Sequence, residues 1–343
     1  MSERVLVAMS GGVDSSVAAA LLLEAGHDVT GVTLKLWGGE SDSGCCSVAD
    51  VEDARRVAAQ LDIPHYVFNF TDDFEANVVT PYTDAYAAGR TPNPCVECNR
   101  TMKFGRLLDR ANAMGFDAVA TGHHARIGRD AQDRPVLVRG ADAAKDQSYV
   151  LYMLGQPALE RIRLPVGELT KAEVREHARQ LGLRTADKRE SMDVCFITRG
   201  GKEAFLGARI DRAPGPIVTT DGETVGSHSG VDAFTIGQRR GVGVALGERR
   251  FVVDVDAPTR TVTIGGKDDM LRNELLVTEP VFAGDPPNGD EAVLVQVRAH
   301  GEPFLGHWRG DRITCASPQP RVAPGQVVAI YRGDVLLGGG IAA

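Results

Sequence analysis

The sequence lacks the features that mark membrane-spanning proteins and secreted, disulfide-rich proteins. Its longest strongly apolar run, Val17–Leu23, is far too short to cross a bilayer. The N-terminus, MSERVLVAMSGG, has no long apolar core followed by a cleavage site, so we expect no secretory signal and a cytoplasmic location. Six cysteines in 343 residues are too few for a disulfide scaffold. We therefore expect them to be reduced, catalytic or metal-binding.

Positive charge and the common nucleotide-binding motifs are also lacking. A net charge of −8 gives no general attraction to nucleic acid or membranes, so any polyanionic partner must meet a local basic face. No G-x-x-x-x-G-K-[ST] motif occurs, which excludes an ordinary Walker phosphate loop. With 43% hydrophobic and 24% charged residues, the chain is typical of a globular protein. Its length predicts two or three domains.

The character of the chain changes near residue 205. Before it, short apolar runs alternate with helical patterns, which predicts an α/β fold with a mainly parallel sheet covered on both faces. Thr170 and Glu173 form a capping box, and Gly182 is a plausible helix end. After residue 205, short β runs separated by Gly, Pro and Asp indicate one or two small β-barrel domains. The predicted strands cover 4–9, 27–37, 64–70 and 117–125, and the predicted helices cover 13–26 and 48–62.

The first chemical signal is MSGGVDSS, Met9–Ser16, at the first predicted strand-to-helix junction. Two glycines allow a tight turn, and the amides of the helix start then face whatever lies above the end of the strand. This arrangement predicts an anion site. Asp14 would repel phosphates unless it holds a magnesium ion, so we expect magnesium to accompany the phosphate ligand.

The second signal is TPNPCVECNR, Thr91–Arg100, and its two cysteines allow several readings. A zinc site could be completed by Cys45 and Cys46, but adjacent cysteines are a poor half of a tetrahedral site. We expect no metal there, and Ser47 instead caps the following helix. An iron–sulfur cluster on Cys95, Cys98 and Cys195 is a stronger rival. Prolines and Asn99-Arg100 disfavour a thioredoxin-like helix, and Cys315 is expected to be a buried strand residue.

The phosphate loop resembles that of the ATP pyrophosphatases, which release AMP and pyrophosphate. Further blocks follow in the order found in bacterial tRNA-specific 2-thiouridylases: GCCS at 44–47, TPNPCVECN at 91–99, ATGHHAR at 120–126, KDQSYVL at 145–151, DVCFI at 193–197 and FTIGQRRG at 234–241. The resemblance spans nearly the whole chain. It implies an ATP-binding α/β domain at 1–205, a small tRNA-contacting central domain at 206–272 and a C-terminal β-barrel domain at 273–343.

The resemblance also implies an activity, namely replacement of the 2-oxygen of the wobble uridine by sulfur in the tRNAs for Lys, Glu and Gln. ATP adenylates that oxygen because a uridine carbonyl oxygen leaves poorly. A cysteine persulfide then delivers sulfur, and a second thiolate closes a disulfide by exchange. The sulfur would come from a donor protein such as a cysteine desulfurase or a sulfur relay protein.

Site residues follow from the matching positions. The resemblance makes Cys98 the nucleophile that helps to release sulfur and Cys195 the persulfide carrier. The positions that match the ATP site are Ala8, Met9, Ser10, Gly11, Gly12, Val13, Asp14, Ser15, Leu34 and Gly122. The positions that match tRNA-contacting segments are Asn93, Pro94 and Cys95, which face the target base, and Lys145, Asp146 and Gln147. Arg239 and Arg240, in a Gly-flanked loop, are further candidates for phosphate contacts.

Three positions depart from the family pattern. Many relatives have Asp at Cys95, so an acid–base role is not carried over to it. The family often shows GHY where this chain has GHH, and we interpret His124 as structural. An Arg-aromatic pair tends to contact tRNA in the last domain, whereas Arg298 precedes Ala299, so that contact is in doubt.

Two other classes of function stay open. An enzyme with the same loop could adenylate a small molecule, and it would not need Cys98 and Cys195. A non-catalytic RNA-binding protein with a structural metal would bind tRNA without forming AMP. Modification of a base at its 2-position requires unstacking, so a single-stranded anticodon loop is a reasonable target.

Overall fold

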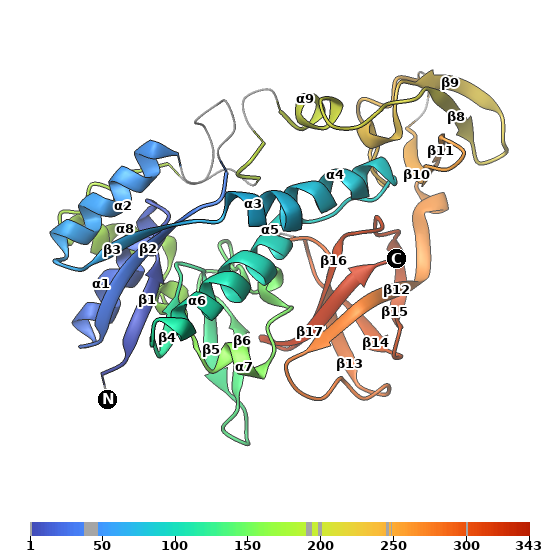
Figure 1. Ribbon diagram of the computed structural model, residues 1–343. Helices are drawn as coiled ribbons and strands as arrows, with labels where there is room; N and C mark the ends of the chain where they lie inside the picture. The colour runs from blue at the N-terminus through green and yellow to red at the C-terminus, as the bar shows by residue number, and fades with distance from the viewer. Residues whose placement is uncertain are drawn as a thin grey trace.

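A computed structural model describes residues 2–37, 47–189, 194–197, 201–244, 247, 249–299 and 301–343. It shows three parts along the chain, an α/β part, a small β part and a barrel, in that order (Figure 1). The predicted fold class is therefore confirmed. The boundaries at 205 and 272 stay a prediction. No helix of the described residues is long and apolar enough to cross a membrane.

The first part is built on a five-stranded sheet in the order β3-β2-β1-β4-β7, and every pair of neighbours is parallel. Its strands are β1 (Arg4–Ala8), β2 (Asp28–Lys35), β3 (His65–Asn69), β4 (Ala118–Ala120) and β7 (Ile162–Arg163). The strand predicted over 117–125 is wrong beyond residue 120. The Thr121 amide still donates to the Arg163 carbonyl of β7, but the chain then leaves the sheet, and the His124 amide donates to the Gln147 side chain instead of to a neighbouring strand.

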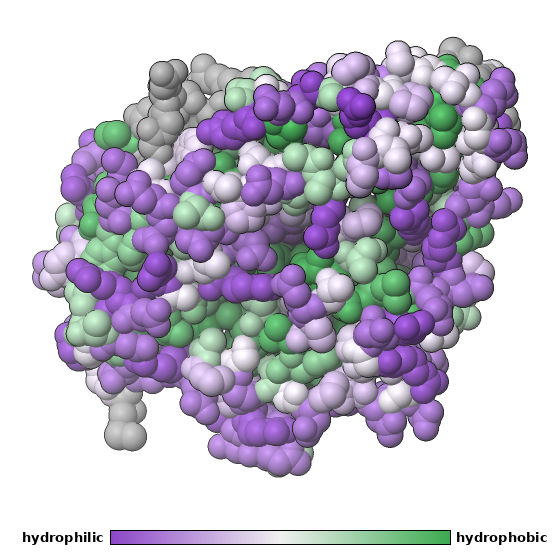
Figure 2. All heavy atoms as spheres, turned by 45° about the vertical axis from the view of Figure 1, so that its right-hand side comes forward, coloured by the Kyte–Doolittle hydropathy of each residue, from purple (hydrophilic) through white to green (hydrophobic). Residues whose placement is uncertain are grey.

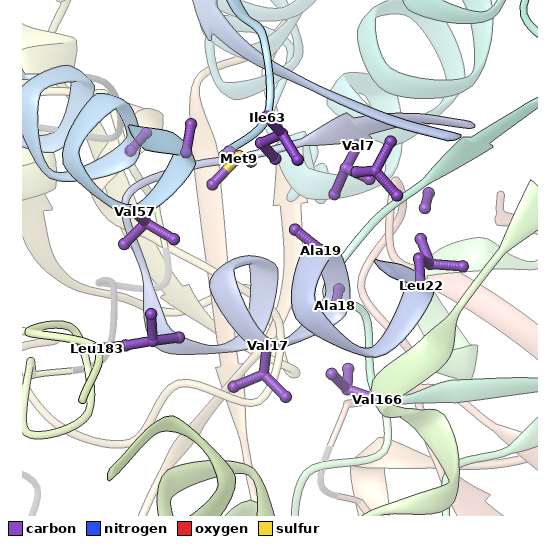
Figure 3. Packing of buried hydrophobic residues seen from close by; sticks show 14 of the residues in the cluster. Val7, Met9, Val17, Ala18, Ala19, Leu22, Val57, Ile63, Val166 and Leu183 are labelled. Atoms are coloured by element: carbon purple, nitrogen blue, oxygen red, sulfur yellow. The ribbon is translucent and has the colours of Figure 1, made fainter. Parts of the chain in front are cut away.

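Helices cover both faces of this sheet. On one face, Val17, Ala18 and Leu22 of α1 (Val13–Glu24) pack with Val7 of β1 and Val57 of α2 (Val48–Gln60), as Figure 3 shows. Helix α8 (Lys171–Gln180) completes this layer. The predicted capping box of α8 and the Ser47 cap of α2 are confirmed. Gly182, in the left-handed region at φ +65°, follows α8 as predicted.

The other face carries two long helical runs that change their winding midway. One run consists of α3 (Thr71–Phe74), a π-helical segment at Glu75–Val79 and α4 (Thr80–Ala87). The other consists of α5 (Pro94–Glu97), a π-helical segment at Cys98–Arg106 and α6 (Leu107–Ala113). The shorter helical segments of the described chain are Ser148–Leu151, α7 (Gln156–Leu159), Pro165–Glu168, α9 (Gly201–Gly207), Val231–Ala233 and Asp268–Met270. Extended π-helical turns occur often at functional sites, and the second one begins at Cys98.

The central part is a four-stranded sheet in the order β10-β11-β8-β9. Its strands are β8 (Gly215–Thr219), β9 (Thr224–His228), β10 (Phe251–Asp256) and β11 (Thr261–Gly265). The sequence RFVVDVDAPTRTVTIGG alternates with period two around an Asp-Ala-Pro-Thr turn, which indicates β structure, and its two halves form the antiparallel pair β10–β11.

The last part is a closed barrel of six strands, in which β12 pairs with both β15 and β17. Its strands are β12 (Leu271–Phe282), β13 (Ala292–Gln296), β14 (Phe304–Trp308), β15 (Arg312–Pro320), β16 (Val327–Arg332) and β17 (Val335–Ala342). A hairpin from the α/β part, β5 (Ala125–Arg129) and β6 (Pro135–Arg139), extends the barrel sheet, because β6 pairs with β17.

The α/β part and the barrel also share a hydrophobic cluster. Val96 of α5 and Tyr149 belong to the same buried cluster as Val327 and Tyr331 of β16. The segment that carries Cys95 and Cys98 is therefore fixed on one side by the barrel. On the face shown in Figure 2, hydrophobic residues gather in a hollowed middle, with hydrophilic residues around it.

Candidate active site

The phosphate loop lies between the end of β1 and the start of α1, as the motif predicts. Gly11 has φ +73°, and a Cβ there would meet the Asp50 carbonyl oxygen at 2.3 Å, so this position requires glycine. Ser15 Oγ accepts a hydrogen bond from the Ser10 amide at 3.1 Å and donates one to the Gly12 carbonyl at 3.1 Å. The loop is thus closed on itself at the N-terminus of α1, where free amides favour an anion.

The other positions matched to the ATP site lie on the two strands that flank β1. Leu34 is on β2, near its end, and Gly122 follows β4. A Cβ on Gly122 would meet the Ser15 amide nitrogen at 2.6 Å, so the turn after β4 packs directly against the first turn of α1. The fold therefore brings together Ala8 to Ser15, Leu34 and Gly122 at the carboxyl ends of adjacent strands, where open α/β sheets bind ligands.

Asp14 does not project alone into the phosphate loop. Its two carboxylate oxygens accept hydrogen bonds from Lys171 Nζ at 2.7 and 2.6 Å, and Oδ1 also lies 3.1 Å from His124 Nε2. Burial raises the pKa of Asp14, but hydrogen bonds from His124 and Lys171 outweigh it and leave this pKa below its ordinary value. The interpretation of His124 as purely structural misses its contact with the phosphate loop.

A magnesium ion that arrives with ATP uses one or two protein carboxylates together with phosphate oxygens. Asp14, whose side chain is 29% exposed, is the one carboxylate among residues 9–16, and it would be the residue to hold such an ion. The described residues contain no group of three or more His, Cys, Asp or Glu placed to hold a metal ion. Cys45 and Cys46, the other half of the zinc alternative, lie outside the described residues.

A second lysine, Lys188, binds the phosphate loop at Gly11. Lys188 Nζ donates to the Gly11 carbonyl at 2.9 Å and to carboxylate oxygens of Asp50 and Asp53 at 2.7 Å each. Burial lowers the pKa of Lys188, but the hydrogen bonds that it donates to the two carboxylates outweigh this effect and raise its pKa. Lys188 therefore links the phosphate loop to the start of α2.

His123, next to Gly122, is buried and neutral. Its Nδ1 lies 2.7 Å from Thr121 Oγ1, and its Nε2 lies 3.5 Å from Lys103 Nζ. Burial, assisted by the charge of Lys103, holds the pKa of His123 well below its ordinary value.

The cysteine stretch begins with an N-cap. Asn93 Oδ1 accepts a hydrogen bond from the Cys95 amide at 3.0 Å, and Pro94 occupies the first helical position. Cys95 is half-buried and Cys98 is buried. The side chain of Asn93 thus orients the helix that carries both thiols.

Cys98 and Cys195 pack against the same hydrophobic cluster, although they are far apart in the sequence. Cys98 is a buried member of this cluster, together with Leu34 and Phe196, and Cys195 packs against it. Tyr82, also in the cluster, lies with its ring centroid 5.3 Å from that of Phe196. No disulfide joins any two of the described cysteines, Cys95, Cys98, Cys195 and Cys315. Cys315 lies on β15, as predicted, but it is half-buried rather than buried.

The segment Lys145–Gln147 uses most of its polar groups within the protein. Asp146 is buried, and its carboxylate accepts hydrogen bonds from Arg139, from the Gly140 amide and from Ser148. Gln147 Oε1 accepts one from the His124 amide at 2.9 Å. Asp146 therefore fixes the conformation of this segment through buried hydrogen bonds. Direct contacts with RNA would have to come from Lys145 and Gln147.

Arg239 and Arg240 are exposed in the central domain. Gln238 fixes their loop, because its side chain accepts from the Thr235 amide and donates to the Arg240 carbonyl. Arg298 of the last domain reaches this loop, with a guanidinium nitrogen 4.0 Å from the position that a Cβ on Gly237 would take. The fold thus brings three arginines of two domains to one region.

Sequence reasoning missed Lys171, Lys188 and Lys103. Their partners are remote in the chain, and a single sequence does not reveal such pairs. One signal was present, because Lys171 directly follows the cap of α8, where a positive charge opposes the helix dipole. A basic residue at the first position of a helix does not stabilise that helix, so its presence there indicates another role for the side chain.

Comparisons with known proteins agree with this architecture. Family models match three consecutive stretches: a tRNA methyl transferase HUP domain at residues 3–199, a tRNA methyl transferase PRC-barrel domain at 203–266 and an aminomethyltransferase beta-barrel domain at 272–342. A solved complex of a 4-thiouridine synthetase with RNA and ATP aligns over 56% of this chain and 44% of its own, with 20% identity and a TM-score of 0.38. That likeness is too slight to bear on function.

Curated relatives match over almost their entire length. The tRNA-specific 2-thiouridylase MnmA of Chloroflexus aurantiacus is 48% identical over 98% of this chain and 97% of the relative. The proteins of that name from Moorella thermoacetica and Acidothermus cellulolyticus are 45% and 46% identical over 98% of this chain, and over 98% and 96% of their own lengths. The resemblance carried by the sequence motifs is thereby confirmed: the chain belongs to the tRNA-specific 2-thiouridylase family.

Proposed function

We propose that the protein replaces the 2-oxygen of the wobble uridine by sulfur in the tRNAs for Lys, Glu and Gln, at the expense of ATP. One observation carries the proposal. Cys98 and Cys195 pack against the same cluster, and this cluster also contains Leu34, a position matched to the ATP site. Packing of both thiols against one cluster that reaches the ATP site supports a reaction that first adenylates and then thiolates a base.

The first step activates the base. The uridine 2-oxygen attacks the α-phosphorus of ATP, the bond between the α-phosphorus and the bridging oxygen breaks, and pyrophosphate leaves with the electron pair. The phosphate loop binds the phosphates through the amides at the start of α1, and Asp14 is the residue that would hold magnesium. A poor leaving oxygen has now become part of a phosphate ester.

The second step delivers sulfur. A donor protein such as a cysteine desulfurase or a sulfur relay protein loads Cys195 with a persulfide. The terminal sulfur attacks C2 of the uridine, and AMP leaves with the former 2-oxygen. The Cys98 thiolate then attacks Cys195 Sγ, which forms a Cys98–Cys195 disulfide and releases the sulfur as 2-thiouridine. The two thiols supply the two electrons that reduce the terminal sulfur, and an external dithiol restores them.

The tRNA would meet three surfaces. Asn93, Pro94 and Cys95 lie at the start of the thiol-bearing helix, and we assign them to the target base. Lys145 and Gln147 flank the turn before Ser148, while Arg239 and Arg240 lie on the central domain. Because Arg298 reaches the same loop, it joins this set despite the missing aromatic residue after it.

The decisive experiment incubates the purified protein with ATP, a persulfide donor and unmodified tRNA, and then measures 2-thiouridine and AMP. We expect both products, with AMP dependent on tRNA. AMP formed equally well without tRNA would indicate an enzyme that adenylates a small molecule, whereas tRNA binding without AMP would indicate a non-catalytic RNA-binding protein. Thiolation that requires bound iron would replace the persulfide mechanism by a cluster mechanism.

A further inference from the structure

The segment 142–147, which contains three positions matched to tRNA contacts, is linked to the phosphate loop by hydrogen bonds at both of its ends. Gln147, at one end, is exposed, whereas His124, which it contacts, is buried. Asp142, at the other end, contacts the first residue of α8. A surface that would meet RNA is thus joined to the interior of the ATP site at two places.

The first link runs through His124. The Gln147 amide donates a hydrogen bond to the His124 carbonyl at 2.8 Å, and Gln147 Oε1 accepts one from the His124 amide at 2.9 Å. The side chain of His124 then reaches the phosphate loop, since its Nε2 atom lies 3.1 Å from Asp14 Oδ1. The Nδ1 atom is buried and has no hydrogen-bond partner among the described residues, so the contact with Asp14 is what orients the imidazole.

The second link runs through the start of α8. Asp142 Oδ2 accepts a hydrogen bond from the Lys171 amide at 2.9 Å, and the Lys171 ammonium group binds both oxygens of Asp14. Asp142 also fixes the turn that leads to Lys145, because its Oδ1 atom accepts from the Ala144 amide and its carbonyl accepts from the Lys145 amide. The two links therefore leave opposite ends of one segment and end on the same carboxylate.

The carboxylate of Asp14 is a place where nucleotide binding must have an effect. It lies in the first turn of α1, and a triphosphate held by the amides of that turn would bring negative charge close to it. The hydrogen bonds that Asp14 accepts from His124 and Lys171 would therefore change in strength or geometry when ATP binds. RNA that contacts Gln147 would act on the outer end of the same set of bonds.

We propose that Gln147 and Asp142 are positioning residues that couple the binding of tRNA to the binding of ATP, through His124 and the start of α8. The inference rests on the proposed function, since it takes the segment 142–147 to contact tRNA and the phosphate loop to bind ATP. Coupling of this kind is reciprocal, so each ligand tightens the binding of the other by the same factor. It gives a physical reason why the formation of AMP should depend on tRNA.

The test compares the binding of unmodified tRNA to the wild type with and without α,β-methylene ATP, an analogue that cannot release pyrophosphate. The coupling factor is the dissociation constant of tRNA without the analogue divided by the constant with it. We expect a factor of roughly 10 in the wild type, within the range of about 5- to 150-fold that is typical of coupled sites. The affinity for the analogue should rise by the same factor when tRNA is added.

Variants at the outer end of each link should lower this factor. Gln147→Met removes the acceptor for the His124 amide, so its factor should fall several-fold, and combination with Asp142→Ala should bring the factor close to one. Gln147→Glu keeps an Oε acceptor and should retain most of the coupling, even if its charge weakens tRNA binding. Gln156→Met is the matched control, because that side chain bonds the Pro135 carbonyl on β6, and its factor should equal that of the wild type.

A residue that only contacts RNA would behave differently. Its loss would weaken tRNA binding equally with and without the analogue, and the coupling factor would not move. A wild-type factor in Gln147→Met, or a factor of one or less in the wild type, would therefore overturn the proposal. If Gln147→Met does not fold, Asp142→Ala alone carries the test, and an unchanged factor in that variant has the same meaning.

The coupling and the proposed function can fail separately. A wild type that shows the coupling, and loses it in Gln147→Met, but forms no AMP with tRNA would contradict the proposed function and support the coupling. A wild type that thiolates tRNA with a coupling factor of one would support the proposed function and overturn the coupling.

Discussion

The Gln326 side-chain amide donates a hydrogen bond to the Thr91 carbonyl oxygen over 2.6 Å, and this bond joins the barrel to the start of the cysteine stretch. The Thr91 amide returns a bond to the Pro324 carbonyl at 2.7 Å. Both ends of Thr91 are therefore held by the loop before β16. The barrel thus fixes the position from which the thiol-bearing helix begins.

We expect Gln326→Ala to lower thiolation more than ATP binding. The change leaves the Thr91 carbonyl without this donor and removes a bond that contributes about 1 kcal/mol to stability. It touches neither the phosphate loop nor a cysteine. Gln319→Ala is the matched control, since that exposed side chain bonds Ser317 on the same strand of the barrel. Equal thiolation by the two variants would mean that the barrel does not position the cysteine stretch.

Gly122 allows the turn after β4 to approach α1, and its replacement should damage the nucleotide site. In Gly122→Ala the new methyl group would lie 2.6 Å from the Ser15 amide nitrogen, so the start of α1 must shift. We expect markedly weaker ATP binding and a loss of unfolding free energy of about 1–3 kcal/mol. Gly155→Ala is the control, because its nearest atom would be Pro157 Cδ at 3.8 Å. An unchanged ATP affinity in Gly122→Ala would place the nucleotide elsewhere.

The buried, neutral His123 should make the protein sensitive to mild acid. Its pKa is well below the ordinary 6.5 in the folded chain, so the unfolded chain takes up a proton at a higher pH than the folded chain does. The free energy of unfolding should therefore fall as pH drops from about 7 to 5, with a slope of up to about 1.4 kcal/mol per pH unit. Denaturant titrations of His123→Gln should show a shallower slope in this window. A slope equal to that of the wild type would mean that other groups cause the acid sensitivity.

The arginines of the central and last domains predict a salt-dependent surface. If Arg239 and Arg240 contact phosphates, Arg239→Ala combined with Arg240→Ala should weaken the binding of cognate and non-cognate tRNAs to the same extent. The slope of log affinity against log salt should fall by about one to two units, near 0.7–0.9 per lost contact. Arg298→Ala should lower it further, because its guanidinium lies beside the same loop. Arg309→Ala, on an exposed residue paired with Asp290, is the control. An unchanged slope in the double variant would make the pair ordinary surface charge.

The sequence predicted the parts of this protein that local signals encode. Each of these signals acts over a few residues and lies where expected: the glycines and serines of the phosphate loop, the Ser47 and Thr170 caps and the β10–β11 turn. The attachment of the β5–β6 hairpin to the barrel was not foreseen, since the pairing of Val138 on β6 with Val335 on β17 joins distant parts of the chain. The contact of Lys171 with the phosphate loop was not predicted for the same reason, because its partner Asp14 lies 157 residues away.

The last prediction concerns the thiols. In the persulfide mechanism Cys98 and Cys195 each perform a covalent step that a serine cannot, whereas Cys95 lines the base pocket. Cys98→Ser and Cys195→Ser should each lose essentially all thiolation, while Cys95→Ser should keep a measurable fraction. Formation of AMP should survive in all three variants, since the phosphate loop is untouched.

A single turnover without reductant should leave a Cys98–Cys195 disulfide in the wild type, which peptide mass analysis would detect. The two cysteines pack in one cluster and no disulfide joins them in this structure, so the disulfide would be a product of turnover. A cluster mechanism predicts the opposite pattern, in which loss of any of the three thiols abolishes activity together with bound iron. If Cys95→Ser is inactive and has lost iron, Cys95 is a ligand and the persulfide mechanism is wrong. If iron-free protein thiolates tRNA from a persulfide donor, Cys98 is the nucleophile that opens the persulfide.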